Sequence, residues 1–216
     1  MGDYVVLPMG GLVRRDNNCQ IFILAGGLST RMGRDKSRVR LGSRTLLGHV
    51  REMAAQTGLR VRVIRRDAVA RCGPIGGIYT GLQRSRAEFL LFLACDMPFI
   101  SASSLKKMAK VLRARDVHGR DIALRCPPGR PSGPSLPPSE FSAAVFATNG
   151  RSFGFPILLQ REAAFPIVAR QIETGELSLQ VLARKLQAKT IRFPARQLAN
   201  INTRDELARA KKKIPR

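Results

Sequence analysis

The chain has 216 residues, of which 44% are hydrophobic and 25% are charged, and its formal net charge is +23. This length and apolar content are typical of a folded domain rather than a disordered protein. The longest uninterrupted apolar run covers residues 89–95, too short to cross a membrane, and the N-terminus shows no signal-peptide pattern. We therefore expect a cytoplasmic protein.

The cysteine and charge patterns exclude further classes. Only two histidines accompany the four cysteines, and no C-x-x-C pair is present, so the sequence offers no zinc pattern. The basic residues are spread along the chain, which has no tryptophan and only two tyrosines with which to stack bases. The charge favours an anionic substrate, and a non-catalytic protein that binds RNA or another partner is the alternative.

The first predicted elements surround a glycine-rich loop. We assign residues 1–18 to an N-terminal extension and residues 19–216 to a single domain. A strand at residues 20–24 runs into residues 24–36, which read L-A-G-G-L-S-T-R-M-G-R-D-K. Glycine lets backbone N–H groups approach phosphate oxygens closely, and the arginine and lysine add positive charge. The loop predicts a nucleotide site, although it matches neither the Walker pattern nor G-x-G-x-x-G, and a tight turn with a solvated basic rim is the alternative.

Three further elements follow before the middle of the chain. A short strand at residues 39–41 leads into a helix that Ser43 or Thr45 caps and Gly58 ends. A second strand at residues 61–64 carries interleaved arginines. Residues 72–82, C-G-P-I-G-G-I-Y-T-G-L, predict a glycine-rich loop that enters a helix packed on the sheet.

The apolar run delivers a carboxylate to the end of a strand. Residues 89–94, F-L-L-F-L-A, are typical of a central parallel strand that is buried on both faces. Asp96 follows at its carboxyl end, where open α/β sheets bind their ligands. A carboxylate there is well placed to bind Mg²⁺, and capping of the next turn is the alternative role.

The C-terminal part of the sequence mixes helices, short strands and one long loop. A predicted helix over residues 105–112 is capped by Ser101 or Ser103, and strands at 121–124 and 143–147 flank a Pro-, Gly- and Ser-rich loop at 125–138. Helices follow at 161–175, broken by Pro166, and at 178–187. A strand at 190–193 then leads to a last helix, which a capping box at residues 203–206 opens.

Four segments resemble the motifs of one family and occur in its order. They are the loop at residues 24–36, G-P-I-G-G-I at 73–78, C-D-M-P at 95–98 and N-I-N-T at 200–203. These segments are similar to those of the molybdenum cofactor guanylyltransferases, which belong to the α/β nucleotidyltransferases. The resemblance spans residues 20–213 and implies a three-layer, Rossmann-like nucleotidyltransferase fold with a mostly parallel central sheet.

The resemblance also implies a reaction and its partners. The family transfers GMP from GTP, with Mg²⁺, to a molybdopterin-type molybdenum cofactor and releases pyrophosphate. Molybdoenzymes or their chaperones are the implied protein partners. A related cytidylyltransferase, or a nucleotidyltransferase with another phosphorylated acceptor, is the nearer alternative, and L-A-G-G rather than L-A-A-G favours guanine over cytosine.

Site roles carry over from the family motifs to individual residues. Asp67 stands where the family reads guanine, since its carboxylate can accept hydrogen bonds from N1–H and the exocyclic amine; a solvated Asp67 beside Arg66 is the alternative. The other implied roles are phosphate binding by the backbone of Leu24, Ala25, Gly26 and Gly27, charge neutralisation by Arg31 and Lys36, metal binding by Asp96, and contact with the acceptor side by Asn200 and Asn202.

The sequence departs from the family in three places. Residues 155–158 read F-P-I-L, with phenylalanine where the family has histidine on the pterin side. The segment at residues 65–72 is short, and an asparagine that helps to read guanine in the family has no counterpart here.

Overall fold

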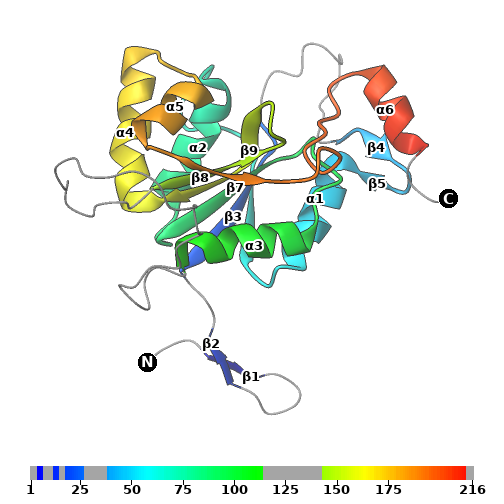
Figure 1. The fold of residues 1–216 in the computed structure, drawn as a ribbon, viewed down its shortest axis with the longest axis horizontal. Coiled ribbons are helices and arrows are strands. Elements are labelled where there is room, and N and C mark those ends of the chain that lie inside the picture. The colour runs from blue at the N-terminus through cyan, green and yellow to red at the C-terminus, as the bar shows by residue number, and fades with distance from the viewer. Residues whose placement is uncertain (1–3, 7–11, 15–17, 27–37, 114–142, 213–216) are drawn as a thin grey trace, which may run out of the picture.

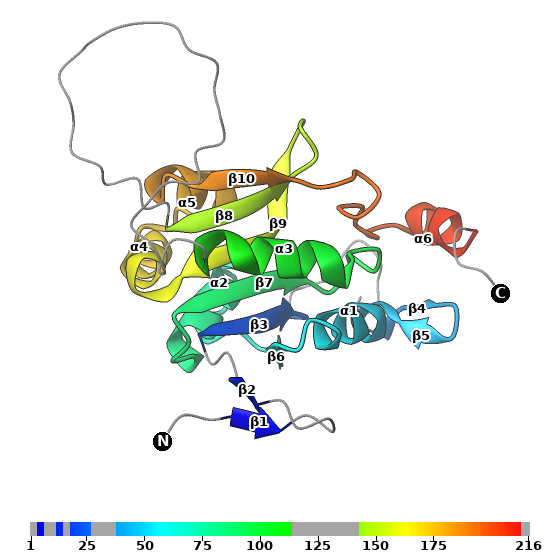
Figure 2. The ribbon, with the colours of Figure 1, turned by 60° about the horizontal axis from the view of Figure 1, so that its bottom comes forward.

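The computed structural model describes residues 4–6, 12–14, 18–26, 38–113 and 143–212. Their centre is a six-stranded sheet in the order β10-β8-β9-β7-β3-β6 (Figure 2). The strands are β3 (Cys19–Leu24), β6 (Arg60–Ile64), β7 (Phe89–Ala94), β8 (Ala144–Thr148), β9 (Phe153–Gln160) and β10 (Lys189–Arg192). The predicted strands at 20–24, 61–64, 89–94, 143–147 and 190–193 are therefore confirmed, each within two residues of its expected bounds, whereas the sequence predicts no strand where β9 lies.

One strand of the sheet runs against the others. β3 is parallel to β6 and β7, and β8 is parallel to β10, whereas β9 lies antiparallel between β7 and β8. The register aligns Leu24 with both Ile64 and Ala94, so β3, β6 and β7 end side by side. The mostly parallel sheet is confirmed, and its carboxyl edge collects the segments that follow these strands.

Two helical layers cover the sheet, with α2, α4 and α5 above it and α1 and α3 below it in Figure 1. One face packs against α1 (Leu46–Ala55) and α3 (Ala102–Arg113), and the other against α2 (Gly73–Arg84), α4 (Arg161–Thr174) and α5 (Leu179–Lys185). Alternate strand residues explain the two faces: Ile21 and Ile23 lie in one buried cluster, whereas Phe22 lies in the other. The three-layer α/β architecture is confirmed.

Smaller elements lie outside these layers. A hairpin of β4 (Arg40–Leu41) and β5 (Arg44–Thr45) shares a small apolar cluster with α6 (Arg204–Lys211). The N-terminal strands β1 (Tyr4–Val6) and β2 (Leu12–Arg14) pair with each other. None of the helices in the described ranges is both long and apolar enough to cross a membrane.

Predicted helix ends are confirmed by their capping bonds. Thr45 Oγ1 accepts from the Gly48 N–H at 3.0 Å, and Ser101 Oγ accepts from the Ser104 N–H at 3.2 Å. The capping box of α6 is complete, because Thr203 caps the Glu206 N–H while the Glu206 carboxylate accepts from the Thr203 N–H.

The predicted break at Pro166 is wrong. Pro166 lies inside a continuous α4. A proline in a helix removes one intrahelical hydrogen bond, but Ala164 and Val168 are fully buried on either side of it. Their packing against the sheet outweighs that local cost. The predicted strand at 121–124 and the loop at 125–138 lie outside the described residues.

Candidate functional site

The structure brings three of the predicted segments to one edge of the sheet. Hydrogen bonds continue past the strand ends: the Ala25 N–H donates to the Ile64 carbonyl at 2.8 Å, and the Cys95 N–H to the Leu24 carbonyl at 3.1 Å. The backbone at Leu24, Ala25 and Gly26 is thereby held between the segments that carry Asp67 and Asp96. Gly27, Arg31 and Lys36 lie outside the described residues.

Asp67 is half-buried against three glycines. A Cβ atom on Gly26 or Gly77 would lie 3.6 or 3.4 Å from Asp67 Oδ1, and one on Gly76 would lie 3.3 Å from Oδ2. The carboxylate therefore packs between the loop after β3 and the first turns of α2. Burial raises the pKa of the Asp67 carboxyl above its ordinary value of 3.8.

Close packing explains the glycines around this carboxylate. A Cβ atom at Gly26 would lie 3.0 Å from the Arg65 carbonyl oxygen, and one at Gly77 would lie 3.0 Å from both Leu24 δ-carbons. These contacts are tight, so even a methyl group would displace the backbone or side chain that shapes the site. The predicted helix in residues 72–82 is confirmed, but it begins earlier than the glycine-rich loop suggests, so that Gly76 and Gly77 lie inside α2.

The N-terminus of α2 lies at the same edge, where Gly76 packs against Asp67. Its cap residue Cys72 makes no side-chain capping bond, and the first turn holds no acidic residue. Helix N-termini carry partial positive charge and favour anions. The preceding Arg71 adopts φ of 62°, a conformation uncommon for a residue other than glycine, so the entry to α2 is locally strained.

Asp96 lies two residues beyond β7, next to the N-I-N-T segment. The Ile201 N–H donates to the Asp96 carbonyl at 2.9 Å, which joins residues far apart in the sequence. The Asp96 side chain is half-buried, and its Oδ1 is shielded from solvent. Asn202 is half-buried beside it, whereas Asn200 is exposed.

A hydrogen-bonded turn fixes Asn202 in place. The Asn202 N–H donates to Glu206 Oε2 at 2.6 Å, and the Thr203 N–H donates to the same oxygen at 2.9 Å. These backbone bonds, that of Asn202 first, lower the pKa of the Glu206 carboxyl below its ordinary value of 4.5. Residues 200–203 are thus set beside Asp96 by the start of α6.

The donor set at Asp96 fits a hard cation that is shared with a substrate. No group of three or more His, Cys, Asp or Glu side chains converges anywhere in the described ranges. Mg²⁺ is commonly held by one or two carboxylates together with substrate phosphates and water, so a single carboxylate at the strand end suits it. His49 does not contribute, because its Nε2 lies 2.7 Å from the Leu41 carbonyl oxygen.

The F-P-I-L segment belongs to the sheet. Phe155 lies in β9 and packs, partly buried, in the cluster beneath α2 and α4, and Ile157 and Leu158 are fully buried. Replacement of histidine by Phe155 therefore removes a polar group from this position and adds apolar surface to the core.

Comparison with known proteins decides the family. Residues 21–190 match the model of the MobA-like NTP transferase domain. The chain belongs to this family. It is similar to a probable molybdenum cofactor guanylyltransferase of Flavobacterium johnsoniae, with 27% identity over 86% of this chain and 93% of the relative. It is 33% identical to the molybdenum cofactor guanylyltransferase of Syntrophotalea carbinolica, over 43% of this chain and 50% of the relative.

A solved structure of another enzyme shares the fold at lower identity. The crystal structure of 4-diphosphocytidyl-2C-methyl-D-erythritol synthase from Anaerococcus prevotii superposes with a TM-score of 0.65 and 12% identity, over 93% of this chain and all of that one. Because that likeness shows the fold alone, the choice of base must come from the site.

Proposed function

We propose that this MobA-like protein transfers GMP from GTP to a molybdopterin-type molybdenum cofactor and releases pyrophosphate. The observation that carries the proposal is the meeting of Leu24–Gly26, Asp67 and Asp96 at one sheet edge, beside the N-terminus of α2. The names of the relatives, which are molybdenum cofactor guanylyltransferases, support the choice of nucleotide and acceptor.

The base-reading role falls to Asp67. Guanine presents two adjacent donors, N1–H and the exocyclic amine, which one carboxylate can accept together. Cytosine presents only its amine there, and so leaves one carboxylate oxygen unsatisfied. A buried acceptor without a donor is costly, so the half-buried Asp67 favours guanine.

The triphosphate falls between the β3 loop and Asp96. The backbone after β3 lies close to the triphosphate, and Arg31 and Lys36 supply positive charge from the same loop in the sequence. Asp96 would hold Mg²⁺, which neutralises phosphate charge when bound. Cytosolic conditions supply both GTP and Mg²⁺, and we place the protein there.

The chemical step depends more on the correct positioning of the two substrates than on proton transfer. The acceptor phosphate is already ionised, so it can attack the α-phosphorus of GTP in line without a general base. Residues of the chain then act by holding the two substrates together and by stabilising the developing charge. Asn202, fixed beside Asp96, lies where the acceptor phosphate must approach, and Asn200 lies on the exposed side of the same segment.

A transfer assay tests the proposal. GTP labelled on its α-phosphate is incubated with the protein, Mg²⁺ and molybdopterin, and label in the cofactor fraction is measured together with pyrophosphate. We expect both products to appear in equal amounts with GTP and not with CTP. Label transfer from CTP in preference to GTP would contradict the guanylyl assignment, and no release of pyrophosphate from any nucleotide would contradict the enzyme assignment.

A further inference from the structure

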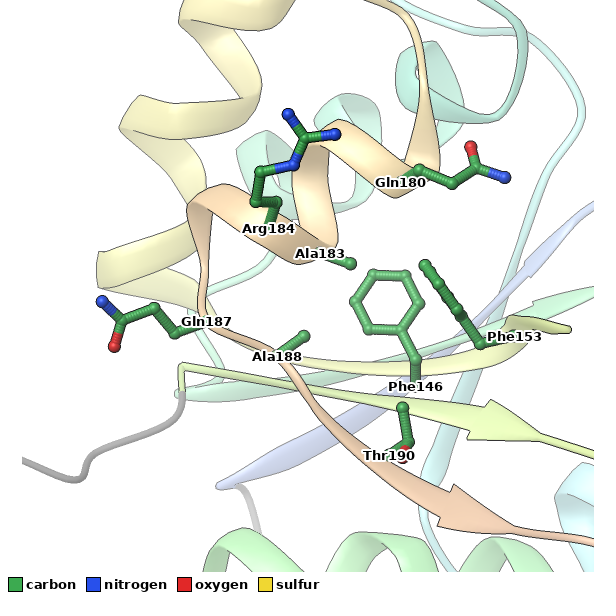
Figure 3. A pocket seen from close by; sticks show the side chains of 8 residues that line it. All are labelled: Phe146, Phe153, Gln180, Ala183, Arg184, Gln187, Ala188 and Thr190. Atoms are coloured by element: carbon green, nitrogen blue, oxygen red, sulfur yellow. The ribbon is translucent and has the colours of Figure 1, made fainter. Parts of the chain in front are cut away.

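A second concave region lies on the opposite half of the sheet. A cavity of about 410 Å³ lies between α5 and the strands β8, β9 and β10, and small-molecule sites commonly start near this size. Figure 3 shows its floor, where the rings of Phe146 and Phe153 lie beside each other below α5. The ring centroids are 5.6 Å apart and the planes perpendicular.

The aromatic floor is only partly covered. Phe146 is fully buried, whereas Phe153 is 38% exposed and is the one large hydrophobic side chain of the described ranges that is exposed. The methyl groups of Ala183 and Ala188 face the same space (Figure 3), so the walls beside the rings are flat and apolar. An exposed aromatic face between small side chains is suited to stacking with a planar ring.

The rim of this cavity is polar and carries no carboxylate. The polar lining side chains are Gln180 and Arg184 on the α5 side of the rings, Thr190 on the β10 side, and Gln187, which points away from the rings (Figure 3). Gln180 Oε1 already accepts from the Ser178 hydroxyl at 2.7 Å, which directs its amide nitrogen outward as a donor. An amide and a guanidinium on the α5 side of an aromatic floor suit a heteroaromatic ring with an amide-like edge and a negative charge.

The topology places the cavity on the face of the sheet that α2 also covers, with its Phe153 end at the edge of the nucleotide site. Phe153 is the first residue of β9 and pairs with Thr148, the last residue of β8. Since β9 is antiparallel to β7, its start lies at the edge where β7 leads into Asp96. α5 and α2 cover the same face of the sheet, and Asp67 packs against α2.

We infer that this cavity holds the heteroaromatic ring of the acceptor substrate, stacked on Phe153, with the acceptor's phosphate directed along the sheet edge toward Asp96. The inference rests on the proposed function, because it assigns the acceptor subsite of the same reaction. GTP then occupies the half of the edge built by β3, β6 and β7, and the acceptor ring occupies the half built by β8, β9 and β10.

Titration of a fluorescent pterin tests the subsite without the labile cofactor. Pterin-6-carboxylate, a planar pterin with one anionic group, is titrated against the full chain, and its quenching gives the affinity. We expect Phe153→Ala to weaken binding about 5- to 100-fold, the loss that follows removal of a stacking aromatic ring. GTP affinity, measured in parallel, should stay within about twofold.

Two further variants separate stacking from general damage. Phe165→Ala removes a half-buried ring from α4 that stacks on Tyr79 and does not line the cavity, and it should leave pterin binding unchanged. Ala183→Leu fills the cavity from α5 without removing Phe153, and it should weaken pterin binding while the protein keeps its thermal stability.

The outcomes distinguish the two levels of the proposal. Equal pterin affinity of the wild type, Phe153→Ala and Ala183→Leu, or no pterin binding by a wild type that binds GTP, would overturn the acceptor subsite and leave the guanylyltransferase proposal intact. Loss of GTP affinity in Phe153→Ala would assign the cavity to the nucleotide and overturn the inference. Failure of the wild type to bind GTP would instead contradict the proposed function itself.

Discussion

In one half of the sheet, β3, β6 and β7 lead at their carboxyl ends into glycines and carboxylates, whereas in the other half β8, β9 and β10 border a cavity with aromatic rings, amides and a guanidinium. In the first half, close contacts at Gly26, Gly76 and Gly77 fix the position of Asp67. In the second half, Phe153 is left exposed over an open cavity. The first half is built for charge and for a defined base, and the second for a planar ring. A transferase that joins a nucleotide to a second substrate needs both.

The largest effect is expected from Asp96→Asn in the nucleotide half. Loss of the metal-binding charge should lower transfer activity by about 2–4 kcal/mol of transition-state stabilisation, because a preorganised electrostatic group is removed. Initial rates over a range of Mg²⁺ concentrations measure it. Asp205→Asn, an exposed aspartate in the first turn of α6, is the matched control and should retain full activity. Normal Mg²⁺-dependent turnover in Asp96→Asn would make the metal assignment wrong.

Lys36→Ala should give a loss of similar size, about 2–4 kcal/mol in the transition state, because the developing phosphate charge loses a counter-charge. The effect should fall mainly on kcat, since charge develops during the reaction. The neighbouring Arg38→Ala provides the comparison for loss of one positive charge near the loop. Equal effects of the two substitutions would show that only net charge matters there.

Gly81→Ala tests the packing beneath the nucleotide half. The new Cβ would lie 2.5 Å from Phe92 Cε1 and 2.9 Å from Phe92 Cζ, so α2 or the ring must move. Overpacking of this kind costs about 1–3 kcal/mol of unfolding free energy, which lowers Tm by about 2–12 °C for a chain of this size. Gly154→Ala, where the added methyl meets open space, is the control for thermal unfolding and should shift Tm little. An unchanged Tm for Gly81→Ala would contradict the close contact.

Asp67→Asn should lower the preference for GTP over CTP and slightly raise the free energy of unfolding. The amide cannot accept both guanine donors, so GTP affinity should fall about 10-fold, and the ratio of GTP to CTP affinity should fall with it. Because burial raises the pKa of Asp67 in the folded state, its charged form destabilises the fold above that pKa. The substitution should therefore raise unfolding free energy slightly near neutral pH, and this gain should vanish as the pH falls below 3.8.

The smallest effect is expected at the junction between the two halves. Thr203→Ala removes the cap of α6 and should cost about 1 kcal/mol of unfolding free energy. Because the same turn holds Asn202 beside Asp96, the KM for the acceptor should rise while GTP affinity stays constant. Thr174→Ala, at the end of α4, removes a hydroxyl remote from the edge and should leave both unchanged. A change in GTP affinity with Thr203→Ala would instead place N-I-N-T on the nucleotide side.

Much of the fold follows from local patterns in the sequence. Apolar runs mark β3 and β7, and Thr45, Ser101 and Thr203 mark helix starts through their hydroxyl groups. The continuity of α4 through Pro166 cannot be predicted locally, because it depends on the burial of Ala164 and Val168 against strands that are distant in sequence. The antiparallel direction of β9 likewise depends on pairing with β7 and β8, which no local pattern reveals.

The site divides in the same way. Asp96 could be predicted because it follows an apolar strand, and the neighbouring glycines could be recognised as a group. Their packing around Asp67 could not, since Gly26 and Gly77 meet the Arg65 carbonyl and Leu24 only in the folded chain. No sequence pattern predicts the cavity beside Phe153, because its lining comes from β8, β9, α5 and β10, whose residues share no motif. An exposed phenylalanine is recognised only once burial is known.

The most direct test of the nucleotide half is a calorimetric titration of GTP, CTP and ATP, each with and without Mg²⁺. We expect GTP to bind more tightly than CTP or ATP, and Mg²⁺ to strengthen its binding in the wild type but not in Asp96→Asn. Binding of GTP that ignores both Mg²⁺ and the identity of the base would contradict the assignment of Asp67 and Asp96 to a guanylyl-transfer site.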